Sequence, residues 1–131
     1  MNVFTYGSLM FPEVWSLVVT GDYRSMQARL DGHARFAIDG ETYPGMVVTA
    51  DAGVTGVVYL NVDDDDLARL DAFEGDEYRR DAVTIVGSDG TTHVAQAYLY
   101  LLEDRLLASA WKPDAFAMQR FIETYCRDRL A

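Results

Sequence analysis

Residues 67–80 of the chain read LARLDAFEGDEYRR, a helical pattern that stops at a glycine and leads into a strand-like segment. A helix turns by about 100° per residue, so Leu67, Leu70 and Phe73 lie on one apolar face. Glu74 follows Leu67 at i+7 and Leu70 at i+4, which places it on the same face. The spacing therefore predicts a carboxylate that points inward among apolar side chains.

Both ends of this helix are marked in the sequence. Asp63 or Asp64 can cap its start, and the other acidic residues of the Asp63–Asp66 run suit the positive end of the helix dipole. Gly75 can end it. Burial and the negative end of the dipole both raise the pKa of a carboxylate at the last position. Glu74 is therefore a candidate for general acid–base catalysis, which uses a carboxyl group whose pKa is shifted toward neutral.

A structural role for Glu74 is the alternative. Its carboxylate could form a salt bridge with Arg79 or Arg80, or cap a backbone amide of a nearby loop. Structural ion pairs also shift pKa values, so the helical pattern alone does not decide between the two roles.

Length and composition predict one domain, residues 1–131, with a substantial core, because half of the 131 residues are hydrophobic and 12% are aromatic. The charge balance of 11 − 21 = −10 repels nucleic acid and anionic lipid, so we expect neither as a partner. The one cysteine, Cys126, cannot form an internal disulfide. The N-terminal MNVFTYGS has neither the basic segment nor the long apolar run of a signal or membrane helix. We therefore expect a cytoplasmic location.

Strands are expected to dominate the middle of the chain. Segments rich in Val, Tyr and Thr alternate there with Gly or Asp clusters. The pair Asp31-Gly32 is expected to form a turn between two of these strands. The predicted strands cover residues 2–6, 23–30, 33–38, 43–50, 53–62, 78–88 and 92–102.

Helices are expected near both ends. Residues 11–19 have apolar residues at helical spacing, and Met118, Phe121, Ile122 and Tyr125 form the apolar face of a C-terminal helix. We expect that helix to close the core. The elements together predict an α+β fold that is compatible with a small closed barrel.

A second candidate site is the loop Tyr6-Gly7-Ser8-Leu9 between the first strand and the first helix. Backbone N–H groups in such a loop can bind an anionic or carbonyl oxygen, and glycine lets a ligand approach closely. Ordinary tight turns use the same residues, so the loop indicates a site only in combination with other features.

The ordered segments VFTYGSLM, YPGMV, GVVY and LDAFEGDEYRRDAV resemble the gamma-glutamylcyclotransferase-like family, and most closely its avirulence-induced-gene-like branch. The resemblance runs from Val3 to about Val83, with looser agreement in AYLY and WKPDAF. It implies a small mixed β-barrel with flanking helices. It also implies that Glu74 is catalytic, that the loop after the first strand binds a glutamyl or 5-oxoproline group, and that Tyr78 and Tyr43-Pro44-Gly45 line the pocket.

The resemblance also implies an acyltransferase reaction, in which a gamma-glutamyl amide cyclises to 5-oxoproline and releases an amine, amino acid or peptide. The substrate's own α-amine is the nucleophile, so we expect no metal or other cofactor. Glu74 would accept a proton from the ammonium and return it to the leaving nitrogen. Amides from Gly7 to Leu9 would hold the oxyanion. The loops Asp39–Thr42 and Leu102–Lys112 are expected to select the leaving group.

Other functions have less support in the sequence. Ser8 with His33 or His93 suggests a hydrolase, but the sequence has no G-x-S-x-G motif. Cys126 is expected to be a packing residue, and its spacing from the histidines fits no metal site. The main alternative is a non-catalytic module that binds a glutamyl-like small molecule, because a ligand ammonium could pair with Glu74. We expect a monomer in either case.

Overall fold

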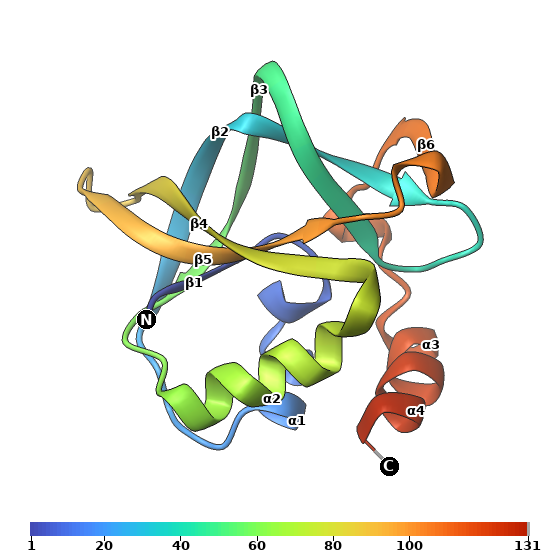
Figure 1. The fold of residues 1–131 in the computed structure, drawn as a ribbon. Helices are drawn as coiled ribbons and strands as arrows, with labels where there is room; N and C mark the ends of the chain where they lie inside the picture. Colours follow the sequence, from blue (N-terminus) through green and yellow to red (C-terminus); the bar gives the residue numbers. More distant parts are fainter. Residues whose placement is uncertain (131) are drawn as a thin grey trace.

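The computed structural model describes residues 1–130, without the side chain of Ala115. Six strands form one sheet: β1 (Val3–Thr5), β2 (Ser25–Ile38), β3 (Pro44–Tyr59), β4 (Tyr78–Gly87), β5 (Thr92–Tyr100) and β6 (Leu106–Ala110). Their order is β3-β1-β5-β4-β2-β6, and β2 also pairs with β3, which closes five strands into a barrel (Figure 1). β1 and β5 are parallel and all other neighbours are antiparallel. The predicted mixed barrel is therefore confirmed.

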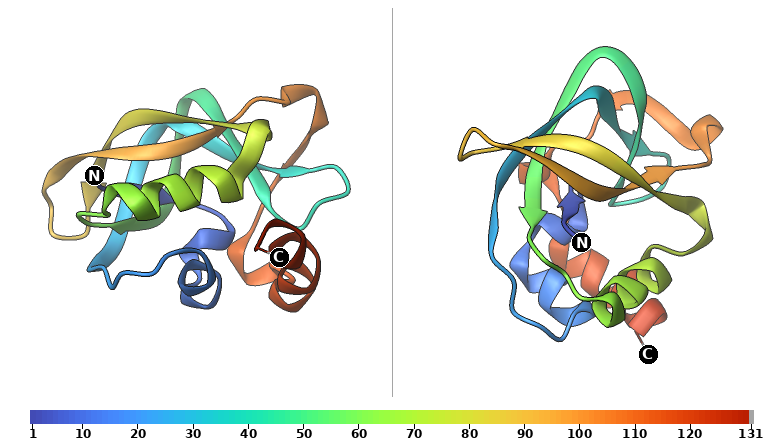
Figure 2. Two further views of the ribbon diagram at one scale, coloured as in Figure 1. Left: turned by 60° about the horizontal axis from the view of Figure 1, so that its bottom comes forward. Right: turned by 60° about the vertical axis from the view of Figure 1, so that its left-hand side comes forward.

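The helices gather on one side of the barrel, as Figure 2 shows. They are α1 (Pro12–Val18), α2 (Asp64–Glu74), α3 (Met118–Phe121) and α4 (Arg127–Leu130), and the π-helical segment η5 (Ile122–Cys126) joins α3 to α4. Short 3-10 turns are η1 (Ser8–Met10), η2 (Gly75–Glu77), η3 (Glu103–Arg105) and η4 (Pro113–Ala115). One buried cluster lies inside the barrel and is made of strand residues together with Tyr6, and a second lies between the barrel and the helices.

Helix α2 begins and ends where the sequence predicts. The Asp63 side chain accepts a hydrogen bond of 2.8 Å from a backbone N–H of the first turn. Gly75 follows the last residue with a φ of 73°, a conformation that glycine adopts without strain. Leu67, Leu70 and Phe73 are buried. The predicted apolar face therefore packs against the core and brings the end of α2 to the barrel.

Asp66 is the one buried residue of the acidic run Asp63–Asp66. Its buried carboxylate accepts hydrogen bonds of 2.9 Å from the N–H groups of Thr20 and Gly21, 2.6 Å from the Tyr23 hydroxyl and 2.8 Å from Arg69. Burial alone would raise the pKa of Asp66, but these hydrogen bonds hold the pKa well below its ordinary value. Asp66 thus connects the start of α2 to the segment between α1 and β2.

One predicted turn and one predicted break between strands lie within long strands. Asp31-Gly32 does not reverse the chain, because β2 continues through it and its register against β3 shifts between Asp31 and His33. The predicted strands 43–50 and 53–62 likewise form one strand, β3, which begins at Pro44 and ends at Tyr59. Bulges of this kind allow a long strand to bend around a barrel. The bend depends on the partner strand, so the local turn pattern led to a wrong prediction.

The predicted loop Leu102–Lys112 contains β6. This strand pairs with β2 through Phe36 and Ala110 and through Ile38 and Leu106. It is largely exposed and lies at the edge of the sheet, so its sequence lacks the alternation of apolar and polar residues that marks a half-buried strand.

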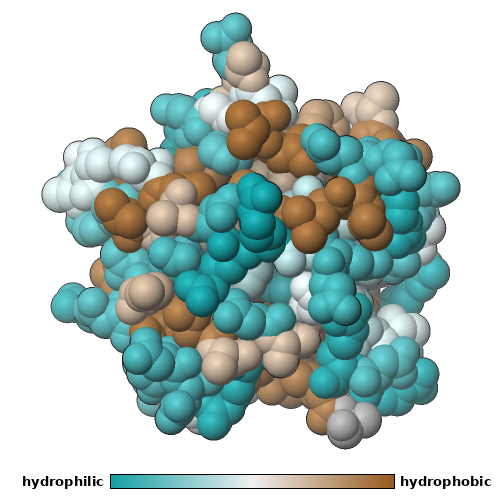
Figure 3. All heavy atoms as spheres, in the orientation of Figure 1, coloured by the Kyte–Doolittle hydropathy of each residue, from teal (hydrophilic) through white to brown (hydrophobic). Residues whose placement is uncertain are grey.

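The surface combines hydrophilic and hydrophobic residues. On the face shown in Figure 3, hydrophobic residues form separate patches among hydrophilic ones. No helix formed by residues 1–130 is both long enough and apolar enough to cross a membrane.

Candidate active site

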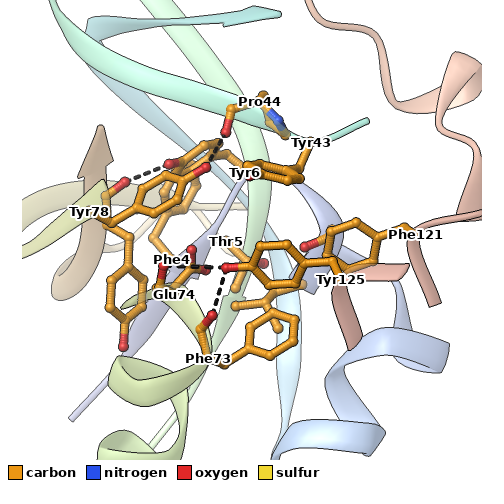
Figure 4. Close-up of a pocket in the computed structure, with 14 residues that line it drawn as sticks. Phe4, Thr5, Tyr6, Tyr43, Pro44, Phe73, Glu74, Tyr78, Phe121 and Tyr125 are labelled. Atoms are coloured by element: carbon orange, nitrogen blue, oxygen red, sulfur yellow. Dashed lines mark hydrogen bonds between the residues drawn. The ribbon is translucent and has the colours of Figure 1, made fainter. Parts of the chain in front are cut away.

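A pocket with an empty volume of about 400 Å³, its mouth included, lies between the barrel and the helices that cover it. Its walls come from β1 and the loop after it, the start of β3, the end of α2, β4, β5 and the C-terminal helical segment (Figure 4). The lining residues are Phe4, Thr5, Tyr6, Gly7, Ser8, Leu9, Tyr43, Pro44, Phe73, Glu74, Tyr78, Tyr98, Phe121 and Tyr125.

Glu74 is the only carboxylate among these lining residues. It is the last residue of α2, and its side chain is partly buried among aromatic rings. Burial raises the pKa of Glu74 to about 8, while Arg129 acts to lower it and Asp71 to raise it. A carboxyl group with this pKa can both accept and donate a proton near neutral pH.

The structural alternative for Glu74, a salt bridge with Arg79 or Arg80, is wrong. Arg79 pairs with Asp81 at 2.8 Å, and Arg80 pairs with Asp71 at 2.9 Å. Within residues 1–130 the Glu74 carboxylate itself takes part in neither a salt bridge nor a hydrogen bond. Its charge is therefore free to interact with a ligand.

Five tyrosines surround Glu74 as a neutral and rigid wall. The Tyr6 hydroxyl donates to the carbonyl oxygen of Tyr98 at 2.5 Å, and the Tyr78 hydroxyl donates to that of Pro44 at 2.8 Å (Figure 4). The first bond connects the loop after β1 to β5, the second connects β4 to β3, and together they hold the two rings in place. Burial raises the pKa of all five phenols, so they remain protonated at neutral pH; they are Tyr6, Tyr43, Tyr78, Tyr98 and Tyr125.

The loop Tyr6–Leu9 forms another side of the pocket and is buried. The backbone N–H groups of Gly7, Ser8 and Leu9 donate no hydrogen bond to any residue of the described chain. A Cβ atom at Gly7 would lie 2.8 Å from Cδ of Pro44, so glycine is needed for the start of β3 to approach the loop. The result is a group of free donors beside the Glu74 pocket.

The sequence pattern of the family described as gamma-glutamyl cyclotransferase, AIG2-like, matches residues 3–113. The chain belongs to this family. AIG2-like protein A of Arabidopsis thaliana is 33% identical to it over 129 residues, which cover 95% of this chain and 78% of that protein. A solution structure of an Arabidopsis thaliana protein has 32% identity and a TM-score of 0.71, covering 95% of this chain and 87% of that one. A structure named gamma-glutamyl cyclotransferase has the same fold, with a TM-score of 0.66 and 21% identity over 76% of this chain and 66% of that one.

In this member of the cyclotransferase family, every predicted site residue except Gly45 lines the pocket. Gly45 instead packs against Tyr100, where a Cβ atom would lie 2.7 Å from the ring carbon Cγ. It therefore serves the packing of the barrel, and the close approach of the two strands explains the glycine. The roles predicted for the residues that do line the pocket, Glu74, Tyr78, Tyr43, Pro44 and the loop Tyr6-Gly7-Ser8-Leu9, stay predictions.

Several pocket residues were not predicted as such. Phe73, Phe121 and Tyr125 were assigned to apolar helix faces, and helical spacing does not separate a core residue from a pocket wall. Arg35 of β2 donates from Nη1 to the carbonyl oxygen of Tyr6 at 2.7 Å and so supports the loop. No sequence signal marks Arg35, because its partner lies 29 residues away in the chain.

Proposed function

We propose that this chain is a gamma-glutamyl cyclotransferase, an acyltransferase that converts a gamma-glutamyl amide into 5-oxoproline and an amine, amino acid or peptide. Membership of the family supports this class of reaction. The observation that carries the proposal is the unpaired Glu74 carboxyl, with its pKa raised to about 8, in a pocket that is lined also by the loop residues Gly7–Leu9. The backbone N–H groups of these loop residues have no hydrogen-bond partner within residues 1–130.

The reaction begins with the substrate's own nucleophile. The α-amine arrives as an ammonium, and the Glu74 carboxylate accepts a proton from it. The freed nitrogen attacks the γ-carbonyl carbon and forms the C–N bond of a five-membered lactam. Because nucleophile and carbonyl belong to one molecule, holding the glutamyl chain folded in the pocket is a large part of the catalysis.

Collapse of the tetrahedral intermediate completes the reaction. Negative charge develops on the former carbonyl oxygen, and we assign the N–H groups of Gly7, Ser8 and Leu9 as its donors, each contributing about 3 kcal/mol. Glu74 returns its proton to the leaving nitrogen, and the original amide C–N bond breaks. In total two protons leave the α-nitrogen and two reach the leaving nitrogen, which departs as an ammonium.

The aromatic wall serves this chemistry in two ways. It removes water from around Glu74, which raises the pKa of its carboxyl toward the range of a useful base. It also keeps water away from the γ-carbonyl, so that cyclisation competes well against hydrolysis. Tyr43, Pro44 and Tyr78 line this wall, and we assign them to contact with the glutamyl chain.

The remaining expectations complete the proposal. We propose a small gamma-glutamyl compound as the partner, no cofactor, a monomeric protein and a cytoplasmic location. A net charge of −10 supports the exclusion of nucleic acid. The loop 39–42 immediately precedes Tyr43, which supports its assignment to the selection of the leaving group.

Turnover tests the proposal directly. The protein is incubated with gamma-glutamyl amines, gamma-glutamyl amino acids and glutathione, and 5-oxoproline is measured by mass spectrometry. We expect enzyme-dependent 5-oxoproline from at least one class. Saturable binding without any product would instead favour a small-molecule-binding module, in which the free Glu74 carboxylate pairs with a ligand ammonium.

A further inference from the structure

The C-terminal helical segment contacts the end of α2 that carries Glu74. The Arg129 guanidinium donates from Nη1 to the carbonyl oxygen of Phe73 at 3.3 Å. The Tyr125 hydroxyl donates to the same oxygen at 2.7 Å and lies 3.3 Å from the carbonyl oxygen of Glu74 (Figure 4). The last carbonyls of a helix have no partner within the helix, so these two side chains supply partners from another segment.

Arg129 and Tyr125 also contact each other. The guanidinium carbon of Arg129 lies 4.5 Å from the centre of the Tyr125 ring, within the range of a cation–π interaction. Tyr125 lines the pocket, and its ring packs edge-on against Phe73 at 5.1 Å and Tyr43 at 4.9 Å between ring centres. Arg129 is not itself a lining residue, so it supports the pocket wall through its contact with Tyr125.

Gly75 provides the space for this arrangement. A Cβ atom at position 75 would overlap the Arg129 guanidinium. The glycine that ends α2 through its positive φ thus also allows a cation to lie at the negative end of the helix dipole.

We propose that Arg129 is a positioning residue of the site, whose guanidinium holds Tyr125 in the pocket wall and places a positive charge at the Glu74 end of α2. Residues 118–130 lie outside the segment 3–113 that the family pattern matches, yet they supply Phe121 and Tyr125 to the pocket. The consequence for catalysis rests on the function proposed above, whereas the charge effect on Glu74 does not.

The groups around Glu74 determine the direction in which Arg129 shifts the pKa of its carboxyl. Burial and the helix dipole favour the protonated carboxyl, Asp71 on α2 acts in the same direction, and Arg129 opposes them. Loss of the guanidinium therefore raises the pKa of Glu74. The other titratable groups that line the pocket are phenols protonated at neutral pH, from β1, β3, β4, β5 and η5 or the residues next to them: Tyr6, Tyr43, Tyr78, Tyr98 and Tyr125.

A titration of Glu74 tests the charge effect without any substrate. Side-chain carboxyl signals of ¹³C-labelled protein are followed by NMR against pH, and Glu74→Gln identifies the signal. We expect Glu74 to titrate at higher pH in Arg129→Gln and in Arg129→Met, which keeps the aliphatic stem. Arg129→Lys should titrate close to wild type. Arg127→Gln is the matched control, because Arg127 lies in the same helix but is exposed and pairs with Asp128.

Rates test the catalytic consequence. We expect 5-oxoproline formation by Arg129→Gln to fall by roughly threefold or more at pH 7, the size of one favourable charge interaction at a helix end. The deficit should shrink as the pH rises above the wild-type pKa, because Glu74 then ionises in both proteins. If Arg129 had a purely structural role, the rate of Arg129→Gln would be lower than that of wild type by the same factor at every pH.

The outcomes separate the two proposals. An unchanged Glu74 titration in folded Arg129→Gln overturns the role of Arg129, and so does loss of folding in both neutral variants. A raised Glu74 titration in a protein that forms no 5-oxoproline from any substrate leaves the role of Arg129 intact and contradicts the cyclotransferase proposal.

Discussion

At the scale of single residues, Glu74 combines burial with a place at the negative end of a helix, and each raises the pKa of its carboxyl. The folded protein therefore binds this proton more tightly than the unfolded chain does. The resulting stabilisation is present below the unfolded pKa of about 4.3 and is lost as the pH rises through the folded value of about 8. Glu74 thus lowers stability at the pH where proton transfer is useful, as expected of a functional residue.

Replacing the carboxyl by an amide separates shape from proton transfer. We expect Glu74→Gln to remain folded and to lose activity by roughly 10² or more, because Gln fits the space but accepts no proton. Formation of 5-oxoproline at pH 8 measures the loss. Asp76→Asn is the control, because Asp76 is exposed two residues further along and should leave the rate unchanged. Equal rates for Glu74→Gln and wild type would rule out Glu74 as the base.

The pH dependence of the rate follows from the same group. A base must be deprotonated, so kcat of the wild-type protein should rise with pH through about 8 and then level off. Stopped incubations from about pH 5 to about pH 10, on both sides of the folded pKa of Glu74, give the profile. A rate that is already at its maximum near pH 5 would show that a carboxyl of ordinary pKa acts instead.

At the scale of secondary structure, α2 is the element that carries the site, and both its ends are fixed by contacts beyond the helix. Asp66 connects its first turn to Thr20, Gly21 and Tyr23, while the C-terminal segment covers its last carbonyls. The Asp66 pKa is lowered, so its stabilising effect is present above the unfolded pKa and is lost as the pH falls below about 4. The position of Glu74 depends on both attachments.

Removing the Asp66 charge should therefore loosen α2. Asp66→Asn presents an NH₂ group to donors, and we expect it to lower the free energy of unfolding by about 2–4 kcal/mol near pH 7. Urea denaturation measures the change. Asp65→Asn, at an exposed position in the same turn, should stay within about 0.5 kcal/mol of wild type. A similarly small effect for both variants would show that the Asp66 charge does not hold α2 in place.

At the scale of the whole molecule, closure of the barrel through β2 and β3 creates the pocket. It brings the loop after β1, the start of β3 and the start of β4 to one end, where α2 and residues 118–130 cover them. No one of these segments forms a site alone, because each contributes only one wall. The pocket is consequently a property of the folded state and should couple ligand binding to stability.

The reaction product provides a measure of this coupling. A ligand that binds only the folded state adds RT ln(1 + [L]/Kd), or about 2.7 kcal/mol at one hundred times Kd. We expect 5-oxoproline to raise the melting temperature in a concentration-dependent way in differential scanning fluorimetry. Proline has the same ring size but no lactam carbonyl and should raise it less. Identical curves with the two compounds would contradict a site built for the lactam.

The sequence by itself determined the features that depend on neighbours along the chain. Asp63, the apolar spacing and Gly75 define α2, and the same spacing places Glu74 on its inner face, because helix periodicity and capping act within a few residues. The ordered motifs also identified the family and most of the pocket residues, although Gly45 lies outside the lining.

Only the tertiary structure decided which distant groups meet. It made Asp31-Gly32 part of a bent strand, buried Asp66, and placed Arg129 at the end of α2. Arg129 and Phe73 are 56 residues apart, and Asp66 and Thr20 are 46 apart. Such contacts arise from closure of the barrel and packing of the helices over it, and no local pattern of side chains encodes them.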